Sequence, residues 1–255
     1  MAVNEQIYRD RDRAESFGSV AAAYDRFRPS YPDALISDLV ELAPDRVLDI
    51  GCGTGKLAVP LVACGLAVLG IEVDPAMAQI ARTHGLIVEQ GAFETWDDDG
   101  RTFDLLTCGQ AWHWIDPEKG SAKAGRLLNP GGTLALAWNH DKYDDDVVAD
   151  LDAVYNKLAP EIANADRSHS DDPFVARLKE SGAFSSVRQH TYRWSMETDT
   201  DEFIGRAGTY SDHIRLPDDR REALFVALRK VIDNHGGTVT SHYRTYTIFA
   251  RTPER

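Results

Sequence analysis

The sequence has few cysteines and fewer basic than acidic residues. Its 255 residues include three cysteines, Cys52, Cys64 and Cys108, and no C-x-x-C pair. An odd number without that spacing fits neither a disulfide framework nor a zinc site. With 28 Lys and Arg against 41 Asp and Glu, the formal net charge is −13. A chain this acidic repels nucleic acid and anionic membranes, so we expect neither as its main partner.

Long apolar segments are also missing. The sequence contains no run of the roughly 18 apolar residues that a membrane-spanning helix requires. The stretch MAVNEQIYRDRDRAESFGS is charged and lacks the apolar core of a secretory signal. Together with the unpaired cysteines, these features predict a cytoplasmic protein.

Short apolar strands alternate with helix-length segments in the first half of the chain. Strands are expected over residues 45–50, 67–72, 86–89, 103–108 and 133–138. This alternation predicts parallel strand pairing and a doubly wound α/β sheet. Leucines at helical spacing over 32–42 predict an amphipathic helix that packs on the sheet.

The second half of the chain has a different pattern. Helices are expected near 145–159, 171–181 and 217–233, and strands over 186–194 and 242–250. The two late strands could form an antiparallel pair at the sheet edge, with the helices between them as a cap.

A glycine-rich loop, VLDIGCGTG, follows the first expected strand and opens a helix. In open α/β sheets ligands bind at this place, and glycine lets the backbone turn tightly and approach a ligand closely. The G-x-G-x-G spacing of Gly51, Gly53 and Gly55 differs from the dinucleotide fingerprint and from the phosphate-binding loop. It therefore disfavours a dehydrogenase, while a tight turn without a ligand remains the alternative.

Glu72 ends the second expected strand, 72 − 51 = 21 residues after the first glycine of the loop. A carboxylate at this position can accept hydrogen bonds from both hydroxyls of a ribose. The alternative is a solvated acid at a strand end. The glycine loop beside it favours the ribose interpretation.

Four segments together resemble class I S-adenosylmethionine-dependent methyltransferases: VLDIGCGTG, VLGIEVDPAM, FDLLTCGQAWHWID and LLNPGGTLALAW. AYDRFRPSYP and Trp112-His113-Trp114 are similar to the small-molecule branch that contains the trans-aconitate methyltransferases. The resemblance implies a Rossmann-like, mostly parallel seven-stranded sheet with an antiparallel edge strand and a helical C-terminal cap. It also implies methyl transfer to a small-molecule carboxylate or hydroxyl, with release of S-adenosylhomocysteine.

The same resemblance divides one domain into four parts: an N-terminal lid segment (1–31), a cofactor-binding core (32–140), a substrate cap (141–240) and a final strand (241–255). It implies that these residues contact S-adenosylmethionine: Tyr24 and Arg28 (closing over it), Asp49, Gly51, Cys52, Gly53 and Gly55 (methionine end), Glu72 (ribose), Val73 and Met77 (adenine), Ala92 and Phe93 (adenine edge), and Gln110 (methionine moiety). Phe93 departs from the small residue usual in the family.

The acceptor side is predicted from the chemistry. Because a methyl group on sulfonium is already activated, the protein mainly has to align the acceptor and exclude water. A base is needed only if the acceptor carries a proton. His113 is the candidate base, because it follows the fourth expected strand, although it could simply pack. Trp112 and Trp114 beside it either line an acceptor pocket or fill the core.

Two further positions are expected to contact the substrate. His140 follows the fifth expected strand and is either a pocket residue or a polar loop residue. Tyr210 lies in the expected cap, where the resemblance implies substrate contacts. Arg206 and Arg215 flank Tyr210 and could pair with an anionic acceptor, although solvated helix arginines are the alternative.

Three functions remain open: a small-molecule methyltransferase, a methyltransferase acting on a macromolecule, and a non-catalytic fold-mate that binds a nucleoside or a protein. Macromolecular enzymes that methylate base amines or glutamine usually carry an Asn/Asp-Pro-Pro-Tyr/Phe turn where this chain has Cys108–Ala111. The intact glycines and Glu72 argue against a decayed site. The runs Asp97–Asp99 and Asp144–Asp146 lack the calcium-loop pattern, so no metal is expected. We therefore expect a small-molecule methyltransferase, monomeric or homodimeric.

Overall fold

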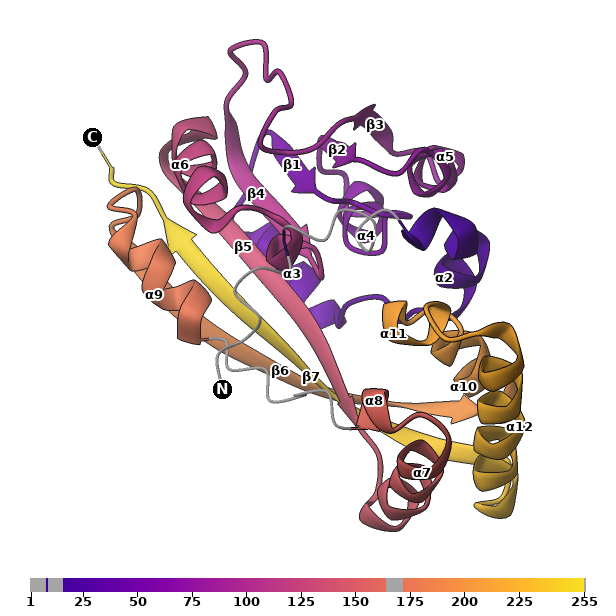
Figure 1. Ribbon diagram of the computed structural model, residues 1–255. Coiled ribbons are helices and arrows are strands. Elements are labelled where there is room, and N and C mark those ends of the chain that lie inside the picture. Colours follow the sequence, from indigo (N-terminus) through magenta and orange to yellow (C-terminus); the bar gives the residue numbers. More distant parts are fainter. Residues whose placement is uncertain (1–7, 9–15, 164–171, 255) are drawn as a thin grey trace.

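One twisted sheet runs through the molecule, with helices on both of its faces (Figure 1). The computed structural model describes Tyr8 and residues 16–163 and 172–254, so most of the first half of the expected lid segment lies outside the described residues. Within the described residues the sheet has seven strands in the order β3-β2-β1-β4-β5-β7-β6. The strands are β1 (Val47–Ile50), β2 (Val68–Glu72), β3 (Ile87–Gln90), β4 (Phe103–Gly109), β5 (Leu128–Lys142), β6 (Ser186–Asp199) and β7 (Thr238–Arg251).

Strand directions agree with the predicted fold class. β1 to β5 pair in parallel, whereas β7 is antiparallel to both of its neighbours, β5 and β6. The antiparallel pairing of the two late strands at the sheet edge is therefore confirmed. The Rossmann-like, mostly parallel sheet is confirmed as well.

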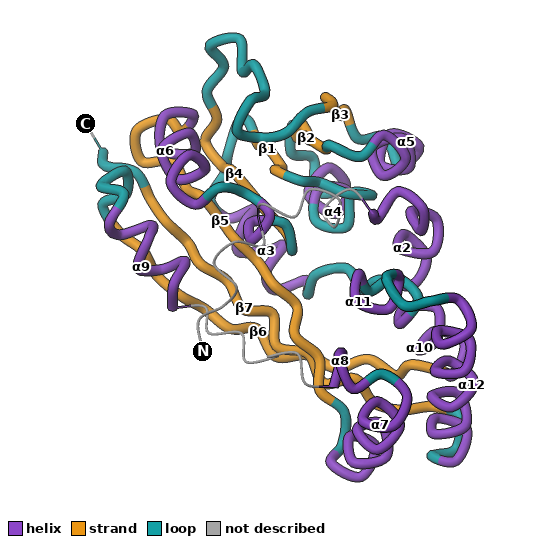
Figure 2. The backbone as a smooth tube through the Cα atoms, in the orientation of Figure 1, coloured by secondary structure: helices purple, strands orange, loops and turns teal. Residues whose placement is uncertain are grey.

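Figure 2 shows how the helices and strands follow one another along the backbone. The helices are η2 (Ser16–Val20), α2 (Ala21–Phe27), α3 (Asp33–Glu41), α4 (Ala58–Ala63), α5 (Pro75–Thr83), η3 (Trp112–Trp114), α6 (Pro117–Leu127), α7 (Asp145–Leu158), α8 (Pro160–Ala163), α9 (Asp172–Glu180), α10 (Thr200–Ala207), α11 (Ser211–Ile214) and α12 (Asp218–Asn234). Within the described residues, no helix combines the length and apolarity needed to cross a membrane.

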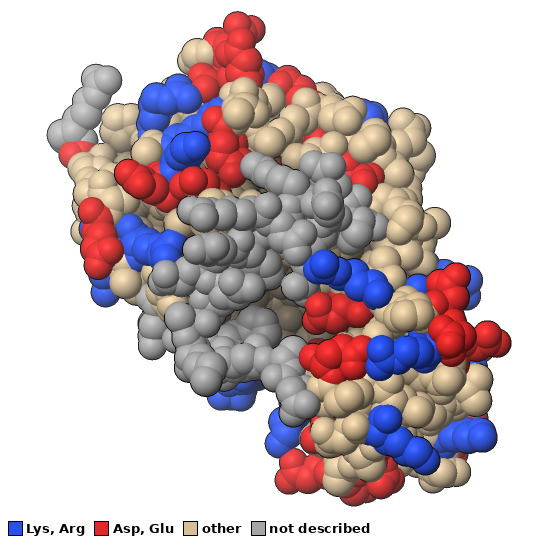
Figure 3. Space-filling model, in the orientation of Figure 1, with Lys and Arg blue, Asp and Glu red and all other residues tan. Residues whose placement is uncertain are grey.

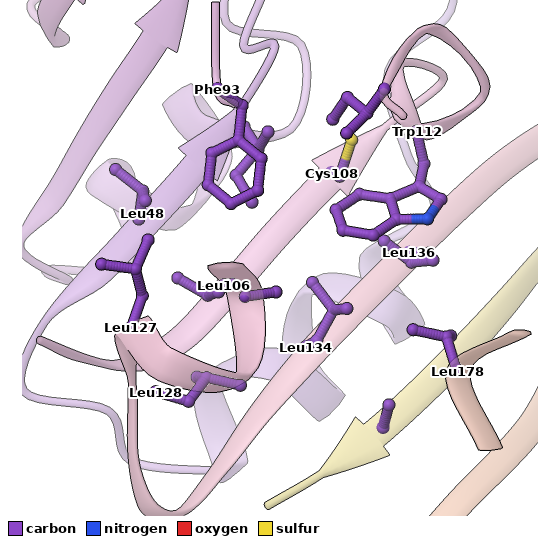
Figure 4. Close-up of a cluster of buried hydrophobic side chains, with 14 of the residues drawn as sticks. Leu48, Phe93, Leu106, Cys108, Trp112, Leu127, Leu128, Leu134, Leu136 and Leu178 are labelled. Carbon is purple, nitrogen blue, oxygen red and sulfur yellow. The ribbon is translucent and has the colours of Figure 1, made fainter. Parts of the chain in front are cut away.

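Two hydrophobic cores hold helices against the sheet. On one face α3, α4 and α5 bury residues such as Leu39 and Leu61. On the other face α6 and α9 pack around Leu106, Leu134 and Trp112 (Figure 4). Both faces of the central strands are thus apolar, as the continuous apolar runs predict for parallel strands.

A third core forms the cap. β5, β6 and β7 extend past the central sheet and carry α7, α10 and α12, which bury Leu151, Phe203 and Leu224 among others. In Figure 1 these helices gather at the far end of the three long strands. The strands were predicted too short, because their outer parts, such as Asn139–Lys142, are polar and end the apolar pattern. Their backbones nevertheless stay paired.

Helix α2 connects the central sheet to the cap. Its Asp25 carboxylate lies 2.9 Å from the His84 ring at the end of α5. The Phe27 ring packs directly on Gly205 of α10, where a Cβ atom would lie 2.6 Å from the ring. Just after α2, Arg28 donates hydrogen bonds to the side chain and carbonyl of Thr209. The segment after residue 16 therefore closes the space between core and cap.

Candidate active site

A cavity lies between the glycine loop, α2 and the cap. Asp49 and Gln110 line it from the carboxyl ends of β1 and β4. Asn139, Arg206 and Tyr243 line it from β5, α10 and β7. The cavity thus begins at the glycine loop and ends against the polar wall of the cap.

The glycine loop needs glycine for conformation and for space. Gly51, Gly53 and Gly55 all have positive φ, at 63°, 55° and 94°, a region that residues with a Cβ rarely adopt. A Cβ on Gly51 would also lie 2.7 Å from the Ala111 side chain. Within this loop the Thr54 hydroxyl is buried and has no hydrogen-bond partner among the described residues. Buried hydroxyls are normally paired, so this one is available to a ligand or water.

Glu72 lies beside this loop and is held by backbone groups. Its two carboxylate oxygens accept hydrogen bonds from Gly53 N at 2.8 Å and Asp74 N at 2.9 Å. Burial raises the pKa of Glu72, and these backbone donors oppose that rise. Each oxygen keeps a second lone pair, so the carboxylate can also accept two hydroxyl groups.

Asp49 is a largely buried residue of the cavity wall. Its carboxylate accepts a hydrogen bond from the Thr107 hydroxyl at 2.7 Å. Burial raises the pKa of Asp49 to about 7, the Thr107 hydrogen bond lowers it, and the nearby charge of Glu72 raises it. A cation bound above Asp49 would stabilise its ionised form.

Aromatic rings and a guanidinium form the lid side of the cavity. The Arg28 guanidinium lies 4.1 Å from the centre of the Tyr210 ring and 5.2 Å from the centre of the Tyr24 ring. On the opposite side Gln110, at φ 59°, donates from Nε2 to the Asn139 carbonyl at 3.0 Å. These contacts bring α2, the end of β4 and the cap to one place.

The structure brings together many of the expected site residues. Those that line the cavity are Tyr24, Arg28, Asp49, Gly51, Cys52, Gly53, Gln110 and Tyr210. Glu72 and Met77 border the loop without lining the cavity, since Glu72 binds Gly53 and the Met77 methyl lies 3.4 Å from where a Gly53 Cβ would be. Gly55, Val73, Ala92 and Phe93 also lie outside the wall of this cavity.

The tryptophans and histidines expected on the acceptor side lie elsewhere. Trp112 is 1% exposed and packs in the core with its ring centre 6.3 Å from that of Phe93 (Figure 4). Trp114 packs against Phe17 of η2, with ring centres 6.4 Å apart, and against His113, at 4.8 Å. None of these five rings lines the cavity. Trp112 therefore fills the core, which was one of its two expected placements.

His140 differs from both of its expected placements. β5 continues to Lys142, so His140 lies in a strand and not in a loop. Side chains alternate along a strand, and Asn139 and Asp141 line the cavity. His140 therefore points to the opposite face of the sheet.

Several residues of the cavity wall were not predicted from the sequence. They include Tyr31, Lys56, Asn139, Asp141 and Tyr243. Asn139 and Asp141 alternate directly after an apolar strand, which is the period-two signal of one strand face. Tyr243 had no such signal, because it enters the site from the far end of the chain.

Comparison with known proteins agrees with this geometry. Residues 47–132 match the model of a methyltransferase domain. An uncharacterized methyltransferase of Mycobacterium tuberculosis is 31% identical over 234 residues, which cover 91% of each chain. The chain belongs to the methyltransferase family. It is thus a methyl-transferring enzyme.

Solved structures show the same fold for this methyltransferase. A candidate type II methyltransferase from Anaeromyxobacter dehalogenans has a TM-score of 0.66 at 21% identity, covering 90% of this chain and 100% of that chain. A phosphoethanolamine N-methyltransferase of Haemonchus contortus has a TM-score of 0.54 at 15% identity, covering 100% of this chain and 61% of that chain. That enzyme was crystallised with S-adenosylhomocysteine and with S-adenosylmethionine. The fold is that of the S-adenosylmethionine-dependent methyltransferases.

Proposed function

We propose that this methyltransferase transfers the methyl group of S-adenosylmethionine to an oxygen of a small-molecule acceptor, a carboxylate or a hydroxyl, and releases S-adenosylhomocysteine. The observation that carries this proposal is a single cavity that joins the glycine loop to a polar wall under the cap. One end is formed by Asp49 and the glycine loop, where the methionine part of the cofactor would bind, and the other end is formed by polar side chains of the cap.

The residues at the loop fit the cofactor. Glu72 has lone pairs for two ribose hydroxyls, and Asp49 offers a negative charge to the ammonium group of the methionine part. The unpartnered Thr54 hydroxyl gives a further polar contact within the loop. When bound, S-adenosylmethionine supplies a methyl group activated by the positive charge on sulfur.

The remaining residues align the acceptor and exclude water. Arg28, held between Tyr24 and Tyr210, closes the cavity from the side of α2. The hydrogen bond from Gln110 to the Asn139 carbonyl joins the end of β4 to β5 beside the cap. Holding two reactants in line in a closed site supplies most of what a pre-activated transfer requires.

A carboxylate acceptor suits this wall because it needs no base. His113, the predicted base, does not line the cavity, whereas Arg206 does. The AYDRFRPSYP segment, which favours the trans-aconitate branch, forms α2 and the turn after it. We therefore place the acceptor among small carboxylic acids in preference to alcohols.

The proposed setting is the cytoplasm, with a small molecule as the partner and a monomeric or homodimeric enzyme. The net charge of −13 opposes nucleic acid and anionic membranes. On the face drawn in Figure 3, lysines and arginines are interspersed with aspartates and glutamates and do not form one basic band.

Calorimetric titration with S-adenosylhomocysteine, with NADH as the control ligand, tests the proposal. We expect one-to-one binding of S-adenosylhomocysteine at micromolar affinity and no binding of NADH. A folded protein that binds neither ligand would contradict the proposal and favour a non-catalytic fold-mate. Binding of NADH alone would overturn the cofactor assignment.

A further inference from the structure

A buried arginine lies at the centre of a hydroxyl cluster on the cap side of the cavity. Arg206 of α10 is 3% exposed. Its guanidinium donates to the hydroxyls of Tyr243 at 2.5 Å, Tyr143 at 2.6 Å and Ser241 at 3.2 Å. Asp141 lies 3.9 Å away. An arginine stays charged even when buried, so a permanent cation lies behind these hydroxyls.

The guanidinium determines where two tyrosine protons can go. It has only N–H donors, so each hydroxyl that it contacts must accept with a lone pair and turn its own hydrogen elsewhere. Tyr143 turns its hydrogen to Asp141, with the two oxygens 3.2 Å apart. Tyr243 accepts from Arg206 and makes no second hydrogen bond to any described residue. Its O–H is therefore left to donate to a ligand.

The Tyr243 side chain is held by packing, keeps its phenol proton and borders the cavity. Its ring lines the cavity. Trp194 of β6 stacks on it, with ring centres 4.3 Å apart and an interplanar angle of 14°. Burial raises the pKa of the Tyr243 phenol, so the hydroxyl keeps its proton at neutral pH. Trp194 is itself fixed, because its indole N–H donates to Thr245 at 2.8 Å.

We propose that Tyr243 binds the acceptor by donating a hydrogen bond to one oxygen of its carboxylate, and that Arg206 is a positioning residue that orients and polarises this donor without touching the acceptor. This inference rests on the proposed function. A carboxylate has two oxygens, so one oxygen held by Tyr243 leaves the other to face the methyl group. A neutral amide gains less from a donor polarised by a buried cation, since hydrogen bonds to charged groups are about twice as strong.

Binding to the complex with S-adenosylhomocysteine tests the inference without knowledge of the natural acceptor. The probes are benzoate, 3-phenylpropanoate and octanoate, each compared with its amide, and titrated into wild type and Tyr243→Phe at saturating S-adenosylhomocysteine. We expect at least one acid to bind the wild type more tightly than its amide does. Tyr243→Phe should bind that acid about tenfold more weakly than the wild type. Affinity for S-adenosylhomocysteine should stay the same.

Tyr192→Phe is the matched control. Tyr192 lies on the neighbouring strand β6, and its hydroxyl contacts Asp38 of α3 outside the cavity. Its variant should bind the acid as the wild type does. Arg206→Lys tests the positioning role through a double-mutant cycle with Tyr243→Phe. The loss on removing the Tyr243 hydroxyl should shrink when Arg206 is replaced, whereas a purely structural role of Arg206 predicts additive losses.

Each outcome decides one claim. If the wild type binds S-adenosylhomocysteine but none of the acids, or if Tyr243→Phe binds the acid unchanged, the role of Tyr243 is overturned and the methyltransferase proposal stands. Additive losses in the cycle overturn the role of Arg206. If the wild type does not bind S-adenosylhomocysteine, the proposed function itself fails, and the inference fails with it.

Discussion

At the scale of single residues, Glu72 connects the glycine loop to the expected ribose position. Its carboxylate already holds Gly53 N and Asp74 N. We expect Glu72→Ala to weaken S-adenosylhomocysteine binding by about 1–3 kcal/mol, because charge-assisted hydrogen bonds to the ribose are lost. Calorimetry measures the change directly.

A control is needed because the variant also removes two contacts to the backbone. Glu197→Ala removes an exposed carboxylate from β6, outside the cavity, and should leave the affinity unchanged. Unfolding in the absence of ligand separates loop disorder from lost binding. Equal affinity of wild type and Glu72→Ala would refute the ribose assignment.

Asp49 predicts a specific dependence of stability on pH. Its folded pKa is about 7, above the ordinary value of 3.8, so between these pH values the folded protein binds more protons than the unfolded chain. The free energy of unfolding therefore falls as the pH rises through this window and stays reduced above it. Asp49→Asn can still accept from Thr107 but carries no charge to bury. We expect it to stabilise the ligand-free protein by about 1–3 kcal/mol at pH 8 and to change little at pH 4.5.

Denaturant unfolding at the two pH values measures this difference. The exposed Asp219→Asn of α12 serves as the control and should show no such pH dependence. The same Asp49→Asn protein should bind S-adenosylhomocysteine less tightly, because the ammonium group loses its counter-charge. A stability change that is equal at both pH values would contradict the buried-charge explanation.

At the scale of elements, the contact of α2 with α10 should control how long the ligand stays bound. A Cβ at position 205 would lie 2.6 Å from the Phe27 ring, so Gly205→Ala must push α2 away from the cap. We expect faster dissociation of S-adenosylhomocysteine, by about threefold to tenfold, since a lid that closes less well releases its ligand sooner. Stopped-flow displacement measures the rate.

Gly208→Ala is the control for this prediction. Its Cβ would meet no atom closer than 3.4 Å, and its φ of −62° suits alanine. The two variants make the same change three residues apart. If both release the ligand at the same rate, α2 does not act as a lid.

The elements also show which signals in the sequence are informative. The central strands were predictable because apolar runs end at glycines, as at Gly51. Helix α6 was overlooked, although Asp116 caps it and Pro117 occupies its first turn, which together are a start signal. The outer part of β5 could not be found from apolarity, because residues such as Asp141 are polar and stay in a strand only through pairing with β7.

At the scale of the whole molecule, ligand binding at the glycine loop should reduce local opening of the cap. Helix α2 touches α5 on one side and α10 on the other. We expect S-adenosylhomocysteine to slow amide hydrogen exchange in α2, α10 and α11, because openings that release the ligand become rarer as its concentration exceeds its Kd. Helix α9 packs with α6 on the opposite face and should be unaffected. Slower exchange confined to the loop would show that the cap is not coupled to it.

The cofactor end of the candidate site was predicted from the sequence, whereas most of the acceptor end was not. The cofactor end lies within one short motif, so local sequence identified Asp49 and the glycines. The acceptor end is assembled from α10, β5 and β7, whose residues meet only through the antiparallel pairing. No local pattern connects Arg206 to Tyr243, and the side chains next to an apparent motif, such as Trp112, went to the core.

The antiparallel pair of β6 and β7 offers a way to engineer enzymes that use other acceptors. Its strands stay paired out to Asp199 and Thr238, where α10–α12 begin and end. A segment covering 200–237 therefore leaves and re-enters the protein at two neighbouring points, so a foreign segment can be spliced in without stretching the sheet. The glycine loop lies outside the exchanged segment. Chimeras joined at these two points would keep the glycine loop, Glu72 and Tyr243, while the residues that α10 and α11 bring to the cavity are changed.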